Sequence, residues 1–178
     1  SMLCDKFDIN VWELISLANR HPRVNILQPG AGVGGHCIAV DPWFIVHAGG
    51  ETAKMIKTAR EVNTYKTEWV IEKIKNAALL FENQNKRKAK VACMGLAFKP
   101  DIDDLRESPA LYISRRLKAD GLEILAVEPN IESHKEFEII NYNKAIDEAD
   151  IVAFLVGHKE FKNLNIKTNL DFCGVLNK

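Results

Sequence analysis

The sequence has no excess of charge of either sign. Its 24 lysine and arginine residues balance 24 aspartate and glutamate residues. Because a basic excess usually drives binding to nucleic acid or to an anionic membrane surface, the composition argues against both partners. An anionic ligand would have to be met by a few local cations.

Long apolar runs are also missing. The longest, such as 151–156, are far too short to span a bilayer, and no basic region followed by an apolar stretch stands at the beginning. We therefore expect a cytoplasmic protein without a membrane partner. Ser1 before Met2 resembles the remnant of a removed tag, so we also expect these 178 residues to begin inside a longer protein.

Cysteine pairs of the Cys-x-x-Cys type are absent as well. The four cysteines lie far apart in the sequence, which argues against a zinc site and against a dense disulfide framework. We expect free thiols and no bound metal. The cysteines are Cys4, Cys37, Cys93 and Cys173.

Apolar residues at helical spacing predict two helical regions in the first half of the chain. The first covers 8–20, with Asp8 as its N-cap, and the second covers 51–82 as one long helix or two in series. Between them, the glycine-rich segment 29–41 predicts a loop. A helix of about thirty residues would span about 45 Å, so we expect part of it to pack against another subunit or domain, as in a homodimer formed through this helix.

The second half of the chain alternates between strands and helices. The polar run 83–90 predicts a solvated linker and a domain boundary. Beyond it we expect strands at 90–95, 123–127, 151–156 and 170–172, helices at 109–120 and 143–149, and a weaker segment at 136–141. Strands separated by helices imply a parallel sheet, so the predicted fold class is α/β, with a helical region at 1–82 followed by a Rossmann-like domain at 83–178.

The most informative segment is the glycine-rich loop around Cys37. Its Gly-x-Gly-x-x-Gly spacing at 30–35 matches a dinucleotide fingerprint, but that motif needs a preceding buried strand and a following helix, whereas a proline precedes it here and Asp41 and Pro42 follow. The residues alone leave Cys37 open as a small buried hydrophobe or as a nucleophile tuned by nearby polar groups. Metal binding by His36 and Cys37 is a poor third interpretation, because adjacent residues point in different directions.

A second candidate segment follows the strand expected at 90–95 and leads into a helix. Ligands bind at this strand-end position in open α/β sheets. Phe98 could pack on an apolar ring, and Lys99 and Arg106 could bind phosphates or carboxylates. The alternative is that the aspartates at 101–104 simply pair with these cations on a solvated loop. A calcium loop does not fit, because the glycine and terminal glutamate of an EF-hand are missing.

Two motifs stand in this order along the chain. The first is Pro-Gly-Ala-Gly-Val-Gly-Gly-His-Cys at 29–37, followed by Asp-Pro-Trp at 41–43, and the second is Ala-Phe-Lys-Pro-Asp at 97–101, followed by Asp-Leu-Arg-Glu-Ser-Pro at 104–109. Together they resemble the UDP-glucose/GDP-mannose dehydrogenase family over nearly the whole chain. The version around Cys37 is most similar to the branch that oxidises UDP-N-acetyl-D-mannosamine, whereas the UDP-glucose branch usually has serine and lysine where His36 and Val40 stand.

The resemblance implies an NAD-dependent oxidation of a sugar C6 alcohol to a carboxylate in two hydride transfers. Cys37 would attack the intermediate aldehyde to form a thiohemiacetal, which becomes a thioester that water hydrolyses, while Asp41 would assist proton transfer or water activation. Covalent capture also prevents a reactive aldehyde from escaping. The residues that the resemblance assigns to binding are Arg23 (from across a dimer interface), Gly34, Phe98 and Lys99 for the UDP-sugar, and Arg106 for the cofactor.

Parts of the family pattern find no match in this chain. The family begins with an NAD-binding Rossmann domain and a helix that carries a catalytic lysine and asparagine. We therefore expect a fragment with half a cofactor site and no appreciable turnover, from an enzyme that makes a nucleotide-linked uronic acid for surface polysaccharide. The alternatives are a non-catalytic nucleotide-binding or scaffold module, which has no need of the thiol, and a cysteine hydrolase, for which His36 is badly placed as the base.

Overall fold

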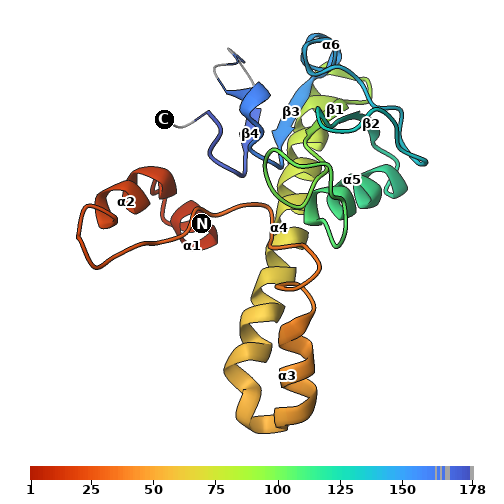
Figure 1. Ribbon diagram of the computed structural model, residues 1–178. Coiled ribbons are helices and arrows are strands. Elements are labelled where there is room, and N and C mark those ends of the chain that lie inside the picture. The colour runs from red at the N-terminus through yellow and green to blue at the C-terminus, as the bar shows by residue number, and fades with distance from the viewer. Residues whose placement is uncertain (163, 165, 167–168, 177–178) are drawn as a thin grey trace.

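The structure, a computed structural model, describes residues 1–162, 164, 166 and 169–176 (Figure 1). Helices dominate the first half, and strands alternate with helices in the second. The elements are α1 (Met2–Lys6), α2 (Val11–Ala18), α3 (Asp41–Gly49), the 3₁₀ helix η1 (Gly50–Ala53), α4 (Lys54–Asn85), β1 (Lys90–Met94), α5 (Pro109–Ala119), β2 (Glu123–Val127), α6 (Tyr142–Glu148), β3 (Ile151–Phe154), the 3₁₀ helix η2 (Lys159–Phe161) and β4 (Asn169–Asp171).

The four strands form one parallel sheet in the order β2-β1-β3-β4. This confirms the predicted α/β fold class with a Rossmann-like sheet. The strand expected at 151–156 ends early, because the amides of Leu155 and Val156 both donate to the carbonyl of Met94 as the chain leaves the sheet. The weaker segment at 136–141 contributes only an isolated bridge between Ala126 and Ile139.

Helices cover both faces of the sheet, which is why its strands are almost continuously apolar. Alternate residues of β1 point to opposite faces. Val91 and Cys93 pack with side chains of α4 and α5, such as Ile74 and Ile113, and this cluster forms the larger core. On the other face, Ala92 and Met94 pack with β3, α6 and η2.

Helix α4 is a single helix of 32 residues, one of the two forms predicted for this region. Its buried residues begin at Lys66, and only this second part packs on the sheet. The first part runs beside α3 and projects from the body as a helical hairpin (Figure 1). Large apolar side chains remain exposed on this hairpin, namely Phe44, Ile45, Met55, Val62 and Tyr65.

Two predictions for connecting regions are wrong, and one helix was not predicted. Asp8 does not cap the first long helix, because Asn10 Oδ1 accepts hydrogen bonds from the amides of Trp12 and Glu13, and α2 begins at Val11. No helix was predicted at Asp41–Gly49, where most side chains are apolar and lack helical periodicity. The run 83–90 is not simply a solvated linker, because α4 continues to Asn85 and Arg87 pairs with Asp150 through two hydrogen bonds of 2.7 and 2.6 Å.

None of the helices in the described part of the chain combines the length and apolar character needed to cross a membrane.

Candidate functional site

A cavity of about 530 Å³ opens at the carboxyl ends of β1 and β3. In open parallel sheets this edge is where ligands bind. Four segments supply most of its walls, at 28–33, 97–100, 155–157 and 173–175. The cavity therefore brings the glycine-rich loop, far away in the sequence, next to the loop that follows β1.

The loop after β1 presents Phe98 and Lys99 to this cavity. Lys99 is exposed, and its Nζ lies 5.6 Å from the centroid of the Phe98 ring. Within the described residues, no carboxylate lies within ion-pair distance of this ammonium group. The expectation that the neighbouring aspartates neutralise Lys99 is therefore wrong, and the cation remains available to a ligand.

Arg106, in contrast, is paired. Its guanidinium makes three hydrogen bonds of 2.6 to 3.0 Å with the carboxylate of Asp104, as the alternative interpretation of this segment expected. These bonds lower the pKa of Asp104 to about 2 and raise the pKa of Arg106. The arginine side chain is still 66% exposed, and its backbone carbonyl accepts a hydrogen bond of 3.3 Å from the amide of Gly35, two residues before Cys37.

Cys37 lies on the surface of the glycine-rich loop, with its Sγ atom 3.0 Å from His36 Nδ1. This contact corrects the expectation that the two adjacent side chains point apart. The carbonyl of Cys37 accepts a hydrogen bond of 2.8 Å from the amide of Asp41, which turns the chain into α3. Asp41 is the first residue of that helix, where Pro42 is also favoured because it needs no amide partner.

The glycine-rich loop and the Phe98 loop pack directly on each other. A Cβ atom on Gly35 would lie 2.9 Å from the Phe98 ring, and one on Gly34 would lie 3.0 Å from Phe98 Cβ. A Cβ on Gly34 would also meet the carbonyl oxygen of Glu107. Glycine is required at these positions because a side chain would force the two loops apart.

Arg23 lies away from this cluster. It stands on an exposed segment between α2 and the glycine-rich loop, and its amide donates to His21 Nδ1 at 3.2 Å. Arg23 is not among the residues that line the cavity. The structure thus places Phe98 and Lys99 at the cavity and packs Gly34 against Phe98 and Pro109 just outside it. Cys37, Asp41 and Arg106 lie on the adjoining segments, and Arg23 lies apart.

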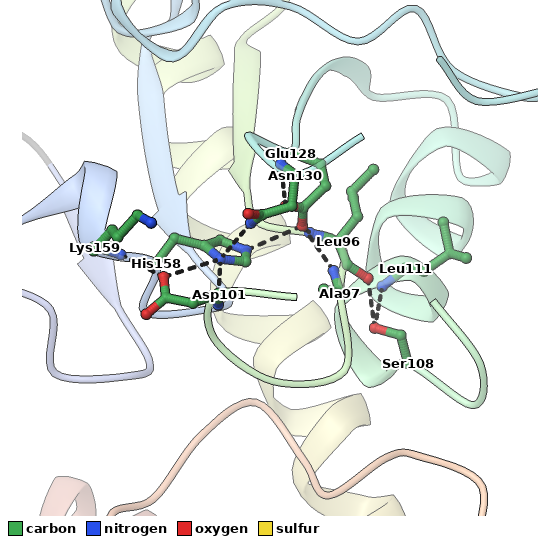
Figure 2. Close-up of polar contacts among 9 residues, drawn as sticks. All are labelled: Leu96, Ala97, Asp101, Ser108, Leu111, Glu128, Asn130, His158 and Lys159. Atoms are coloured by element: carbon green, nitrogen blue, oxygen red, sulfur yellow. Dashed lines mark hydrogen bonds and ion pairs between the residues drawn. The ribbon is translucent and has the colours of Figure 1, made fainter. Parts of the chain in front are cut away.

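The sequence interpretation missed two polar residues beneath the site, Glu128 and His158. Both side chains are fully buried, and they lie 3.0 Å apart, Glu128 Oε2 to His158 Nε2 (Figure 2). Glu128 directly follows β2 and His158 stands four residues beyond β3. A polar residue just beyond the carboxyl end of a buried parallel strand is the signal that could have identified them.

Comparisons with known proteins agree with this arrangement. The model of the central domain of the UDP-glucose/GDP-mannose dehydrogenase family matches residues 1–65, and the model of its UDP binding domain matches residues 92–175. The UDP-N-acetyl-D-mannosamine dehydrogenase of Campylobacter jejuni is 56% identical over 97% of this chain and 43% of its own length. An NDP-N-acetyl-D-galactosaminuronic acid dehydrogenase of Ralstonia solanacearum is 54% identical over 93% of this chain and 39% of its own length.

Solved structures show the same similarity. A UDP-N-acetyl-mannosamine dehydrogenase from S. aureus superposes with a TM-score of 0.83 at 38% identity, over 99% of this chain and 43% of that one. One from Pyrococcus horikoshii gives a TM-score of 0.85 at 30% identity with the same coverage. The chain thus spans about two fifths of the length of the relatives that it matches. It belongs to the UDP-glucose/GDP-mannose dehydrogenase family, of which it carries the central and UDP-binding domains.

Proposed function

We propose that this chain is the part of an NAD-dependent nucleotide-sugar 6-dehydrogenase that binds the UDP-sugar and carries the reactive thiol. The proposed reaction converts UDP-N-acetyl-D-mannosamine to UDP-N-acetyl-D-mannosaminuronate. One observation carries the proposal: the loop of Cys37 packs on the loop of Lys99 at the carboxyl edge of the sheet. A ligand whose phosphates meet Lys99 would extend its sugar along the glycine-rich loop toward the thiol.

The cavity suits a nucleotide sugar in size and chemistry. Its volume of about 530 Å³ is in the usual range of small-molecule sites. Apolar walls at Phe98 and Leu155 can pack on the flat base, and the exposed ammonium of Lys99 can neutralise a diphosphate. The missing side chain of Gly34 contributes to substrate binding by allowing the glycine-rich loop to pack on Phe98, which lines the cavity.

We assign the covalent chemistry to Cys37. Its sulfur adds to the C6 aldehyde to form a thiohemiacetal, which loses a hydride and a proton to become a thioester, and water then releases the acid and restores the thiol. His36 Nδ1, 3.0 Å from the sulfur, is close enough to exchange a proton with it. We assign assistance in proton transfer or water activation to Asp41, the first residue of α3. Retention of an exposed thiol beside His36 favours an enzyme over a non-catalytic scaffold.

NAD supplies the hydride acceptor for both oxidation steps when it is bound. The residues described here fit one edge of such a cofactor, because the guanidinium of Arg106 is exposed, its backbone is bonded to Gly35 in the loop of Cys37, and it can meet a phosphate or ribose group. The segment 30–35 is no dinucleotide fingerprint, since an extended segment rather than a sheet strand precedes it. We therefore expect no turnover by the 178-residue chain alone.

We further propose a homodimer formed through the helical hairpin, with the functional division at 1–82 and 83–178. The apolar side chains exposed on α3 and on the first part of α4, including Phe44 and Met55, would be buried by a second copy. Arg23 would then reach the ligand of the partner subunit. Sedimentation at micromolar concentration tests this assembly, and a clean monomer would contradict it.

The test of the binding site is a calorimetric titration of the chain with UDP-N-acetyl-D-mannosamine, run beside UDP-N-acetyl-D-galactosamine, UDP-glucose and NAD. We expect saturable binding of the UDP-sugars, weakened at least tenfold by Lys99→Ala because a charge-assisted phosphate contact is lost. The variant Lys135→Ala, which removes an exposed lysine that pairs weakly with Glu136, is the matched control. Equal affinity of the wild-type chain and Lys99→Ala would refute the assignment.

A further inference from the structure

The carboxylate of Glu128 is buried completely and yet fully bonded. Its Oε2 atom accepts hydrogen bonds from the amides of Leu96 at 2.8 Å and Ala97 at 2.9 Å, and it lies 3.0 Å from His158 Nε2 (Figure 2). Its Oε1 atom accepts from the amide and the side chain of Asn130, both at 3.1 Å. Burial raises the pKa of Glu128, but the bonds from His158, Leu96 and Ala97 outweigh burial, so the pKa lies below its usual value and the group stays ionised.

The partners of His158 determine where its ring proton lies. Its Nδ1 atom is 3.0 Å from the amide nitrogen of Asp101 and 3.1 Å from the side-chain nitrogen of Asn130. Both are N–H donors, so Nδ1 must offer a lone pair and the proton must be on Nε2. That proton points at Glu128, and the carboxylate therefore selects the tautomer that can hold Asp101.

The Glu128–His158 pair thus hydrogen-bonds to the loop after β1 at both of its ends. Glu128 holds the amides of Leu96 and Ala97, where the loop begins, and His158 holds the amide of Asp101, where it ends. Asp101 is held from the other side as well, because its Oδ1 accepts a hydrogen bond of 2.9 Å from the amide of Lys159. Phe98 and Lys99 lie between these two attachment points and face the cavity.

The backbone position of Lys99 depends on these hydrogen bonds. Its own side chain is exposed, and the part of the chain that the structure describes offers it no ion pair. A long flexible cation binds a phosphate best when its backbone is already in place, because less motion is lost on binding. Apolar side chains in place of Glu128 and His158 would avoid the free-energy cost of burying the charge of Glu128. They would, however, leave the loop amides that these two residues bind without hydrogen-bond acceptors.

We propose that Glu128 and His158 are positioning residues for nucleotide-sugar binding, which fix the backbone of Phe98 and Lys99 from beneath the site. This inference rests on the proposed role of Lys99. His158→Gln keeps a donor toward Glu128 but removes the acceptor at Nδ1, whereas His158→Asn places an oxygen near the Nδ1 position and can still accept from Asp101. The two variants therefore separate the loop contact from the mere filling of the space.

The experiment is calorimetric titration of the chain with uridine diphosphate. We expect His158→Gln to weaken binding about tenfold, the size of one lost buried hydrogen bond, and His158→Asn to weaken it less. In a double-mutant cycle, we expect His158→Gln to cause no further loss once Lys99→Ala is present, because the histidine acts through the lysine. Thermal unfolding of each variant measures the structural cost separately.

Each outcome has one meaning. If the wild-type chain does not bind uridine diphosphate, or Lys99→Ala binds it equally well, the proposed nucleotide site is wrong and this inference falls with it. If Lys99→Ala weakens binding but His158→Gln binds like the wild type, or loses the same factor with and without Lys99, the positioning role is overturned while the nucleotide site stands. A lowered melting temperature with unchanged affinity would likewise assign the pair to stability alone.

Discussion

Substituting Gly34 by alanine tests the contact between the cysteine loop and the Phe98 loop most directly. The new methyl group would lie 2.7 Å from Pro109 Cδ and 3.0 Å from Phe98 Cβ, and closer still to the carbonyl oxygen of Glu107. Ordinary contacts of this kind are near 3.5 Å. A proline ring and a backbone carbonyl cannot rotate away, so one of the two loops must move.

The expected cost follows from the size of this overlap. Inserting one methyl group into a closely packed site destabilises a protein by about 1 to 3 kcal/mol. For a chain of this length, each kcal/mol lowers the melting temperature by roughly 2 to 4 °C, so Gly34→Ala should melt about 2 to 12 °C below the wild type. Because the displaced loop carries Phe98 and Lys99, the affinity for UDP-sugars should fall as well.

Gly30→Ala is the matched control on the same loop. The nearest atom to its new methyl group, the carbonyl oxygen of Gly32, lies 3.9 Å away, an ordinary contact. Both substitutions reduce the entropy of the unfolded chain equally, so their difference reports the packing alone. Calorimetric melting of the two variants within 1 °C of each other would refute the proposed contact between the loops.

Three further predictions concern titratable groups. Burial lowers the pKa of Lys66 from 10.5 to about 8, so the charged lysine destabilises the folded state below pH 8, and this cost decreases as the pH rises above 8. The free energy of unfolding of the wild type, measured by urea denaturation, should therefore rise relative to that of Lys66→Met by about 2 kcal/mol from pH 7 to 10. A constant difference would contradict this. The hydrogen bonds of Arg87 lower the pKa of Asp150, so Asp150→Asn should lower the melting temperature at pH 7, with a difference from the wild type that shrinks as the pH falls below 4; a difference that does not change with pH would contradict the pairing. Iodoacetamide at pH 8 should modify exposed Cys37 well before Cys93, whose pKa burial raises to about 11, as mass spectrometry of the native protein would show; equal rates would contradict the burial.

The elements of the sheet domain could be predicted because their local signals agree with their surroundings. Strand Glu123–Val127 has the predicted bounds, and α5 begins where Ser108 caps it and Pro109 supplies its first residue. The glycine-rich loop and the loop after β1, which carries Phe98 and Lys99, were recognised as candidate segments from residue types alone. Their packing against each other was not predicted and is seen only in the structure, and the roles of their residues stay predictions.

Other features depended on contacts that no local pattern contains. Helix α3 has no polar face, and its residues take helical form beside α4 rather than because of their own periodicity. Glu128 and His158 lie thirty residues apart in the sequence. They meet because β2 and β3 flank β1 in the sheet, so the residues that follow these two strands come together beside the loop after β1. The contact of His36 with Cys37 depends on side-chain rotamers, which sequence spacing does not define.

The uneven burial of α4 means that one continuous helix has two different local stabilities. From Lys66 onward its side chains belong to the core, so amide hydrogens near Val70 and Ile74 should exchange with solvent only when the whole molecule unfolds. The turns before Lys66 contain no fully buried side chain, and they can open while the sheet stays intact. The change from fast to slow exchange of the amide hydrogens of α4 should therefore occur within a single turn near Lys66. A molecule that binds the helical hairpin would slow exchange only in the segment before Lys66.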